Sequence, residues 1–326
     1  MKKFLNLSTK VYNDVERHNY WRKMVFLIRT IAHHKQMMKL IEFFEENHLR
    51  RDISTAQPCV FEQATRQWFY HQSNFSERTE IIKRHYLVAN DCFTEDALRQ
   101  IYLGDGIMLW NQEYQNEMLS LNLHFSRGSH EKEGLMAILL KIGKKRIYQI
   151  IFWLAPNRKN EMALWIGALQ GSPNGLQLSR GLTKLFYGYR TKNFILHALC
   201  IVARQLALKK IYAVSNYGFY TNNHVRLDRK LKTSLDEFWQ ELDGKLCKDT
   251  RFFELPISEL RKDLDEVDSH KRNQYRKRFA MLDAVDSTIA QSLEQYLKKT
   301  FSHKLLFDSL GSCEEIIPQT LDFTRP

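Results

Sequence analysis

Apolar and polar residues alternate without a break over residues 119–125, which predicts a half-buried strand. Three further apolar runs follow, at residues 135–142, 146–155 and 162–169. Short turn-rich segments such as Gly143-Lys144-Lys145 separate these runs, so the four strands are predicted to form an antiparallel meander.

After Gly175 the apolar period becomes helical and stays so to about Lys209, and a short strand is then predicted over residues 210–215. Phe252 to Leu255 is predicted to be one more short strand. A meander, a helical crossover and a further strand predict an α/β protein with an α+β-like mixed sheet.

Helical periods dominate both flanks of this sheet. Residues 1–110 are predicted to be a helical N-terminal section, which includes a long pattern from Trp21 to Phe44 that is interrupted at His33-His34-Lys35 and a short helix at Thr65–Phe69. Thr94, and either Thr233 or Ser234, are expected to cap further helices. Residues 111–300 form the predicted core, which ends in a long helix with an apolar stripe from Tyr275 to Tyr296, and residues 301–326 form a tail.

The net charge of the chain indicates which class of partner it can bind. The net charge is +12 with a pI near 9.4, which favours an anionic ligand such as acyl-coenzyme A, lipid or nucleic acid. No apolar run approaches the ~18 residues of a membrane span, and the N-terminus lacks the apolar core of a signal peptide. The five scattered cysteines suit a reducing compartment. We therefore expect a cytoplasmic protein, with peripheral association at the inner membrane left open.

The turn after the fourth strand is the first candidate site. Gln170, Gly171 and Gly175 lie between a strand and a helix, where backbone amides can approach a phosphate, and Lys184 and Arg190 follow with added charge. The strand order resembles that of acyl-coenzyme A transferases of the GNAT superfamily, and this resemblance implies that the turn binds pyrophosphate. Pro173 stands where such enzymes carry a glycine, and a plain strand-to-helix turn is the alternative.

A catalytic base is assigned to His224, because it lies in the loop after the strand at residues 210–215 and histidine titrates near neutral pH. The familiar hydrolase, protease and nucleotide-binding signatures are missing, and no spacing of cysteine or histidine predicts a metal site.

The beginning of the last helix is the second candidate site. Lys271, Arg272, Arg276 and Arg278 lie within eight residues, and cations at a helix N-terminus oppose the helix dipole. They are predicted to bind an anion, together with Trp239. The alternative is a solvated helix end balanced by the acidic residues just before it.

Several blocks resemble the VirK/YbjX family of Gram-negative bacteria over about residues 20–300. These blocks are Ile166–Gly171, Leu182–Lys184, Tyr187–Arg190, Phe238-Trp239, Asp243-Gly244, Phe253–Pro256 and Lys271–Phe279. The chain departs from the family pattern at Thr191, where proline is common, and at His270, where a lysine is common. The resemblance implies a domain of unknown biochemical function that is linked in name to virulence.

The sequence therefore predicts two alternative functions. The first is an envelope- or virulence-associated N-acyltransferase that takes acyl-coenzyme A and an unidentified peptide, protein or lipid acceptor. The second is a non-enzymatic regulator or adaptor that binds nucleic acid or anionic lipid through the basic helix. Arg190, Trp239, Arg272 and Arg276 are predicted to approach one pocket near the C-terminal ends of the strands.

Overall fold

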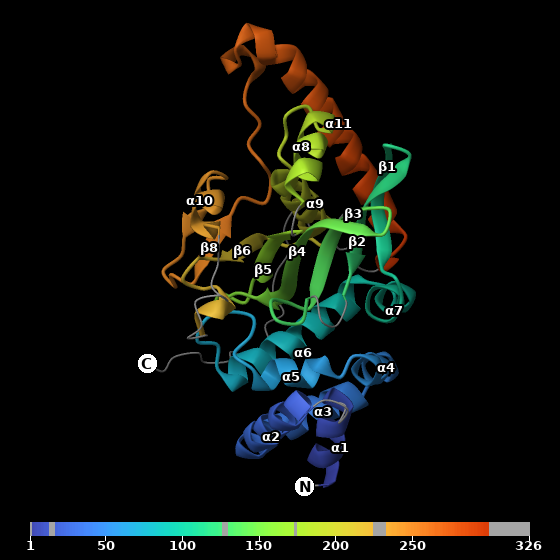
Figure 1. Cartoon of the computed structure of the whole chain (residues 1–326), viewed down its shortest axis with the longest axis vertical. Helices are drawn as coiled ribbons and strands as arrows, with labels where there is room; N and C mark the ends of the chain where they lie inside the picture. The colour runs from blue at the N-terminus through green and yellow to red at the C-terminus, as the bar shows by residue number, and fades with distance from the viewer. Residues whose placement is uncertain (1, 13–16, 126–129, 173–174, 224–232, 300–326) are drawn as a thin grey trace, which may run out of the picture.

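The apolar strands of the meander form the centre of one sheet, in which eight strands are described (Figure 1). The strands are β1 (Ile107–Tyr114), β2 (Glu117–His124), β3 (Met136–Ile142), β4 (Lys145–Pro156), β5 (Met162–Gly171), β6 (Lys210–Val214), β7 (Lys245–Leu246) and β8 (Phe252–Leu255). Their spatial order is β1-β2-β3-β4-β5-β6-β8-β7. Every neighbouring pair is antiparallel except β5 and β6, which are parallel.

The computed structural model describes residues 2–12, 17–125, 130–172, 175–223 and 233–299. His224 and the predicted tail 301–326 lie outside these ranges. The helices are α1 (Lys2–Val11), α2 (Arg17–Ala32), α3 (His34–Glu45), α4 (His48–Ala56), α5 (Cys59–Thr65), α6 (Phe75–Cys92), α7 (Glu95–Leu103), α8 (Leu176–Leu185), α9 (Thr191–Gln205), α10 (Leu235–Gln240) and α11 (Ser269–Glu294), with the 3₁₀ turns η1 (Tyr220–Asn223) and η3 (Leu264–Glu266).

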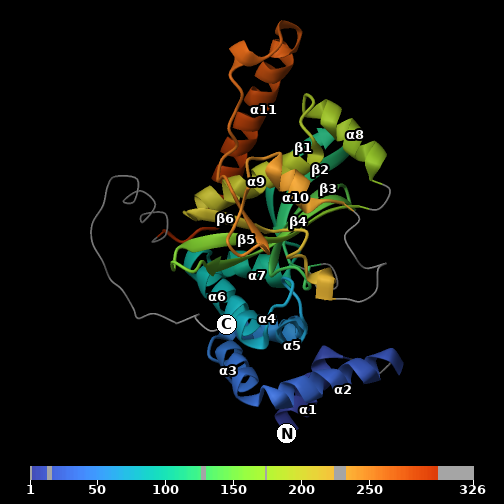
Figure 2. The same cartoon turned by 90° about the vertical axis from the view of Figure 1, so that its left-hand side faces the viewer.

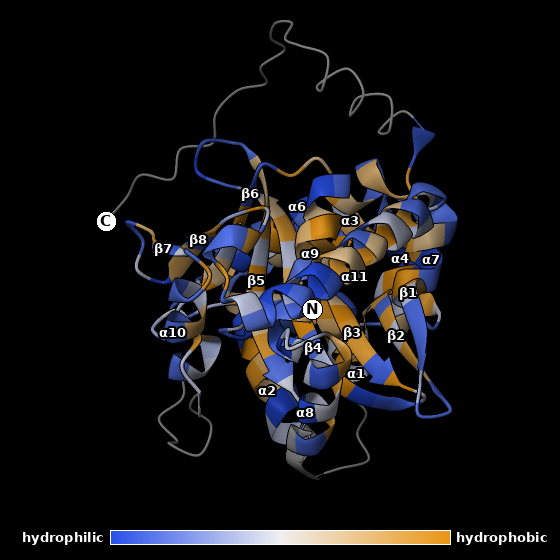
Figure 3. Ribbon diagram, turned by 90° about the horizontal axis from the view of Figure 1, so that it is seen from above, coloured by the Kyte–Doolittle hydropathy of each residue, from blue (hydrophilic) through white to orange (hydrophobic). Residues whose placement is uncertain are grey.

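Helices cover both faces of the sheet. α6 packs on β4 and α7 on β1 and β2, whereas α9 packs on β3, β4 and β5 from the other side and α11 packs on α9 and β1 (Figure 1). The strands between them are apolar along most of their length, as the hydropathy colouring of β3 and β4 shows (Figure 3). Strands that are buried on both faces need such near-continuous apolar runs.

The helical section forms a further layer rather than a detached unit. α1, α2 and α3 lie beyond α5 and α6 as seen from the sheet (Figure 2), and a single buried cluster extends from Phe4 in α1 to Leu293 in α11. Asn74 and Glu77 form a reciprocal capping box that fixes the start of α6. No helix among the described residues is long and apolar enough to cross a membrane.

The predicted meander, crossover and following strand are all present. β2 to β5 pair in sequence order, α8 and α9 make the crossover, and β6 joins β5 in parallel. Thr94 and Ser234 cap α7 and α10 by accepting backbone N–H groups, as expected, and the long C-terminal helix is α11.

Three local predictions were wrong or incomplete. β1 and β7 were missed, because β1 is an edge strand with an exposed polar second half and β7 has two residues. The helix expected at Thr65–Phe69 is instead α5 (Cys59–Thr65). Pro58 is the N-cap of α5, a position whose N–H makes no hydrogen bond within the helix, so proline is tolerated there. Phe69 has φ of 68°, a value outside the right-handed helical region, so the helix cannot extend to it.

Candidate functional site

β5 and β6 separate halfway along β5. Their parallel pairing begins at Ala163 with Lys210 and ends at Ile166 with Ala213. β6 then stays with β8, because the N–H of Ser215 donates to the carbonyl of Arg251 at 2.8 Å. β5 continues to Gly171 with β4 as its only partner among the described strands. The end of β5 therefore has an edge of backbone groups that no described strand pairs.

A bulge marks the point of separation. Ile151 pairs with Ala168 and Phe152 pairs with Ile166, so Gly167 is an extra residue in β5. A Cβ atom on Gly167 would lie 1.8 Å from the carbonyl oxygen of Glu133. Only glycine permits this approach, which holds the turn before β3 against the bulge.

The turn at residues 130–134 brings a buried carboxyl group to this point. Gln63 of α5 donates from Nε2 to the carbonyls of Glu131 at 2.8 Å and Gly134 at 3.0 Å, and the N–H of Phe69 donates to the carbonyl of Lys132 at 2.8 Å. These bonds fix the turn between α5 and the sheet. The side chain of Glu133 is buried beside the end of β5 as a result.

Burial raises the pKa of Glu133 to about 7, although the charge of Lys132 and hydrogen bonds from Tyr220 and Gln170 lower it in part. Tyr220 belongs to η1, which follows β6. A carboxyl group with a pKa near the working pH can both accept and return a proton, which is the property of a general base.

Gln170 is a direct partner of this carboxyl group. Its Nε2 donates to Oε1 of Glu133 at 3.3 Å, and its Oε1 accepts from Gln149 of β4 at 2.7 Å. Arg146 in turn donates to Oε1 of Gln149 at 2.8 Å. The structure thus places Gln170 inside β5, facing Glu133, whereas the sequence suggested a turn residue.

Cations gather on the other face of the same strand end. Gly171 lies against the ring of Tyr148, where a Cβ would be 3.1 Å from the ring. Burial raises the pKa of Tyr148 and the nearby charge of Arg190 lowers it in part, so Arg190 acts on this phenol. Arg190 is the N-cap of α9, and its Nη2 pairs with Oε2 of Glu241 at 2.5 Å.

Lys192, in the first turn of α9, is 3.9 Å from the same carboxylate. Burial lowers the pKa of Lys192, the charge of Arg190 lowers it further, and Glu241 opposes both effects. No side chain caps the N-terminus of α9. The start of α9 thus combines two cations with the N-terminus of a helix, beside the carboxylate of Glu241 and within reach of the charge of Glu237.

The other predicted phosphate-binding residues lie apart. Gly175 is the N-cap of α8 and Lys184 is in its last turn, so about 13 Å of helix separates them. Residues 173–174 of the turn are outside the described ranges, as is His224.

The basic start of α11 is largely occupied by internal contacts. Lys271 pairs with Asp268 at 3.0 Å, and Arg272 donates from Nε to the carbonyl of Val267 at 3.0 Å. Arg278 donates to the carbonyl of Tyr187 from Nε at 3.1 Å and from Nη2 at 2.9 Å. Arg276 is exposed. These contacts explain most of the cations as ties between α11 and its neighbours.

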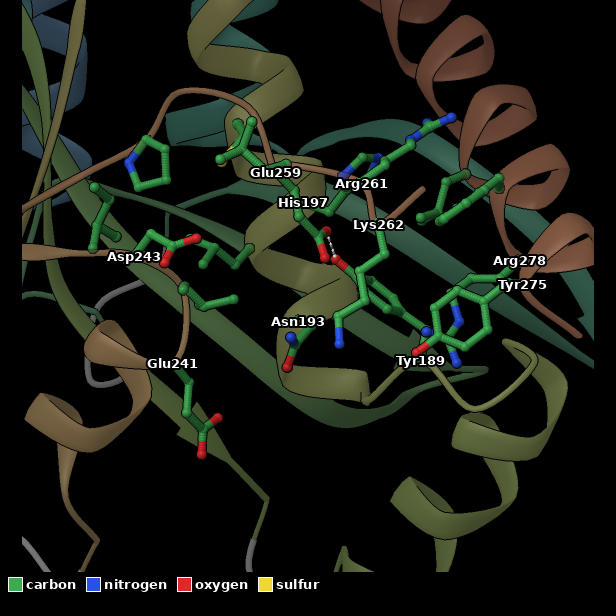
Figure 4. A pocket seen from close by; sticks show the side chains of 18 residues that line it. Tyr189, Asn193, His197, Glu241, Asp243, Glu259, Arg261, Lys262, Tyr275 and Arg278 are labelled. Carbon is green, nitrogen blue, oxygen red and sulfur yellow. Dashed lines mark hydrogen bonds between the residues drawn. The ribbon is translucent and has the colours of Figure 1, made fainter. Parts of the chain in front are cut away.

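A cavity of about 240 Å³ lies between α9, the segment after β8 and α11 (Figure 4). Tyr189 donates a hydrogen bond to Glu259 there, and Oδ1 of Asp286 lies 2.5 Å from Nε2 of the lining residue His197. Arg278 lines this cavity too, as Figure 4 shows.

This cavity is not the common pocket predicted for Arg190, Trp239, Arg272 and Arg276, because none of the four lines it. Trp239 is fully buried and donates its indole N–H to the carbonyl of Val214 at 2.9 Å, so it supports the end of β6. No group of histidine, cysteine or acidic side chains within the described ranges could hold a metal ion.

The sequence reasoning missed Glu133, Tyr148, Gln149 and Tyr220. The only signal for Glu133 is its place in the polar run His130–Glu133 before a strand, and such a run normally predicts an exposed turn.

Comparison with known proteins places the chain in a family. The family model described as "Protein of unknown function (DUF535)" matches residues 16–291. The chain is 27% identical over 244 residues to the uncharacterized protein YbjX of Escherichia coli (strain K12), across 73% of each chain. An uncharacterized protein of Haemophilus influenzae is 27% identical over 222 residues, which cover 66% of this chain and 71% of the relative. The chain therefore belongs to the DUF535 family, the family of YbjX that its sequence blocks resemble.

Proposed function

We propose that this protein is an N-acyltransferase that uses an acyl thioester of a phosphate-bearing carrier such as coenzyme A. The observation that carries the proposal is the separation of the parallel strands β5 and β6 beside the buried carboxyl group of Glu133. An envelope- or virulence-associated role in the cytoplasm is the setting that we propose for it.

The strand topology supports a GNAT-like core. An antiparallel meander leads through α8 and α9 to β6, which is parallel to its neighbour β5 and leaves it after four pairs. β8 is inserted between β6 and β7. In enzymes of the superfamily that the sequence resembles, such a divergence opens the cofactor cleft.

The free edge of β5 suits the amide-bearing arm of the donor. Backbone groups of residues 168–171 pair with no described strand on the β6 side, and an extended chain with amides can pair with such an edge. The phosphates of the donor would be held by Arg190, Lys192 and the N-terminus of α9. The turn from Gln170 to Gly175 borders the same strand end.

Glu133 replaces His224 as the base in this proposal. The Glu133 carboxylate accepts a proton from the ammonium group of the acceptor, and the resulting amine attacks the thioester carbon. The N–C bond forms, the C–S bond breaks, and the leaving thiolate takes the second proton of the attacking nitrogen. A backbone N–H of residues 168–171 that pairs with no described strand would donate to the thioester carbonyl oxygen, which becomes negative during the attack.

Calorimetry with acetyl-coenzyme A and a long-chain acyl-coenzyme A tests donor binding. We expect Glu133→Gln to keep the affinity of the wild type and to lose release of free thiol in the presence of amine acceptors. Absence of binding for both donors at high micromolar concentration, in a chain with native thermal unfolding, would refute the proposal.

A second function, capture of nucleic acid by α11, is favoured by one observation. Arg276 and Lys277 are exposed on the half of α11 that projects beyond the rest of the molecule (Figure 2). Retention on heparin that falls steeply with salt and is lost in Arg276→Glu/Lys277→Glu is the expected result. Equal retention of this variant and the wild type would exclude that role for α11.

A further inference from the structure

One side of α2 carries large apolar side chains that are exposed to solvent. The side chains of Trp21 and Ile28 are 70% and 62% exposed, and Tyr20, Met24 and Ile31 are exposed as well. At 100° per residue these five positions fall within about 100° of the helix circumference. They therefore form one continuous stripe, which we call the α2 stripe.

The stripe is additional to the face with which α2 joins the fold. Phe26, Leu27 and Thr30 lie on a neighbouring side, centred about 120° from the stripe, and are buried where α2 packs on α1 and α5. The ring of Phe26 makes an edge contact with Tyr12 at 6.0 Å. A helix that already has a buried face does not need a second apolar face for folding, so folding alone does not explain the α2 stripe.

Positive charge predominates near the stripe. Residues 1–32 contain two acidic residues, Asp14 and Glu16, and neither lies in α1 or α2. The cations of these two helices are Lys2, Lys3, Lys10, Arg17, Arg22, Lys23 and Arg29. Lys3 pairs with Glu45 of α3 at 3.0 Å. Residues 1–32 thus hold seven cations and two acidic residues, which is an excess of positive charge.

We propose that α2 docks on an anionic lipid bilayer, lying in the interface with the α2 stripe in contact with the acyl chains. An apolar face with Trp and Tyr beside a cationic face is the composition of helices that lie in the membrane interface. α1 and α2 together form the end of the molecule away from β5 and α11, and no other described helix or strand extends beyond them there (Figure 2).

A second copy of the chain suits this surface less well. In a two-fold dimer through the α2 stripe, each helix would meet its own copy, and the cations of α1 and α2 would face each other although neither helix contains a carboxylate. An anionic bilayer instead supplies the missing negative charge and the apolar environment together. This inference is independent of the proposed transferase activity.

Flotation with vesicles tests the inference. We expect the full chain to float with vesicles of phosphatidylglycerol and phosphatidylethanolamine, and at least tenfold less with phosphatidylcholine alone. Trp21→Glu/Ile28→Glu should reduce flotation at least tenfold without changing thermal unfolding. The matched control is Leu246→Glu, which changes a 55% exposed apolar residue of β7 and should float as the wild type does.

A second measurement keeps the test decisive if the double variant unfolds. Brominated phosphatidylglycerol should quench part of the tryptophan fluorescence of the wild type, and the conservative Trp21→Phe variant should bind the vesicles but lose that quenching. Flotation equal on neutral and anionic vesicles, quenching that persists in Trp21→Phe, or a lipid-free dimer that Ile28→Glu dissociates would each overturn the proposal.

Discussion

The carbonyl oxygen of Glu133 lies 1.8 Å from the position that a Cβ atom on Gly167 would occupy. This approach couples the bulge of β5 to the turn that carries the candidate base. Because the obstructing atom belongs to the backbone, it cannot move aside as a side-chain end could. The separation of β5 from β6 and the position of Glu133 therefore depend on the same glycine.

Gly167→Ala is expected to lower the free energy of unfolding by about 3 kcal/mol, because the new methyl group displaces the turn at residues 130–134. Urea unfolding measures this change. Gly181→Ala in α8 is the matched control, since its Cβ would meet only the hydroxyl of Tyr114, the end of a flexible side chain, and an unfolding free energy unchanged or raised is expected. Equal effects of the two substitutions would contradict the coupling.

Glu133→Gln should change how stability depends on pH. The pKa of Glu133 is raised from 4.5 to about 7 in the folded state, so the folded chain binds more protons than the unfolded chain between these values. Stability is then lost as pH rises through this window, by about 3 kcal/mol in total. Glu133→Gln has no titrating group at this position. Its free energy of unfolding relative to the wild type should therefore rise by that amount between pH 4.5 and pH 8.

Urea unfolding at several pH values gives the difference directly. Glu113→Gln, which removes an exposed carboxyl group of β1, is the matched control. If the free energy of unfolding of Glu133→Gln depends on pH as that of the wild type does, the carboxyl group of Glu133 does not titrate in this range.

The meander could be predicted because its information is local. Alternation in β2 and turn residues such as Gly143, which has φ of 52°, specify strands and their antiparallel connections without knowledge of the rest of the chain. The insertion of β8 between β6 and β7 could not be predicted in the same way, since it joins segments whose order in space is decided by packing.

The candidate site shows the same limit. Glu133 belongs to a polar run, and its burial follows from Gln63, Phe69 and Gly167, none of which is near it in sequence. Arg190 and Gly171 were predicted from local blocks, and the structure brings both to Tyr148. The sequence therefore allowed some residues of the site to be predicted. It did not allow prediction of the face of the sheet on which each residue lies.

His85 predicts sensitivity to acid. Its Nδ1 accepts the N–H of Leu154 at 3.0 Å, so the neutral ring carries its proton on Nε2, which lies 2.5 Å from the hydroxyl oxygen of Tyr102. Burial lowers the pKa of His85 to about 3, so the unfolded chain binds more protons below pH 6.5. Stability should fall by about 3 kcal/mol from this residue between pH 6.5 and pH 4.

His85→Gln keeps an acceptor for Leu154 but does not titrate, so its stability relative to the wild type should improve by that amount as the pH falls. Unfolding of both proteins at pH 6.5 and pH 4 gives the comparison. His34→Gln, which changes an exposed histidine of α3, is the matched control. A constant difference between His85→Gln and the wild type would refute the prediction.

Arg190 and Glu241 predict opposite changes in donor affinity. If the N-terminus of α9 holds the donor phosphates, Arg190→Ala removes a cation and should weaken acyl-coenzyme A binding about tenfold, or ~1.4 kcal/mol. Glu241→Gln removes the carboxylate that pairs with Arg190 and Lys192, and should tighten binding, because that carboxylate repels a phosphate. Calorimetry at low and high salt measures both effects, which should shrink as salt rises. Lys184→Ala, at the far end of α8, decides between the two predicted phosphate positions: a larger loss for Lys184→Ala than for Arg190→Ala would move the phosphate site from α9 to α8.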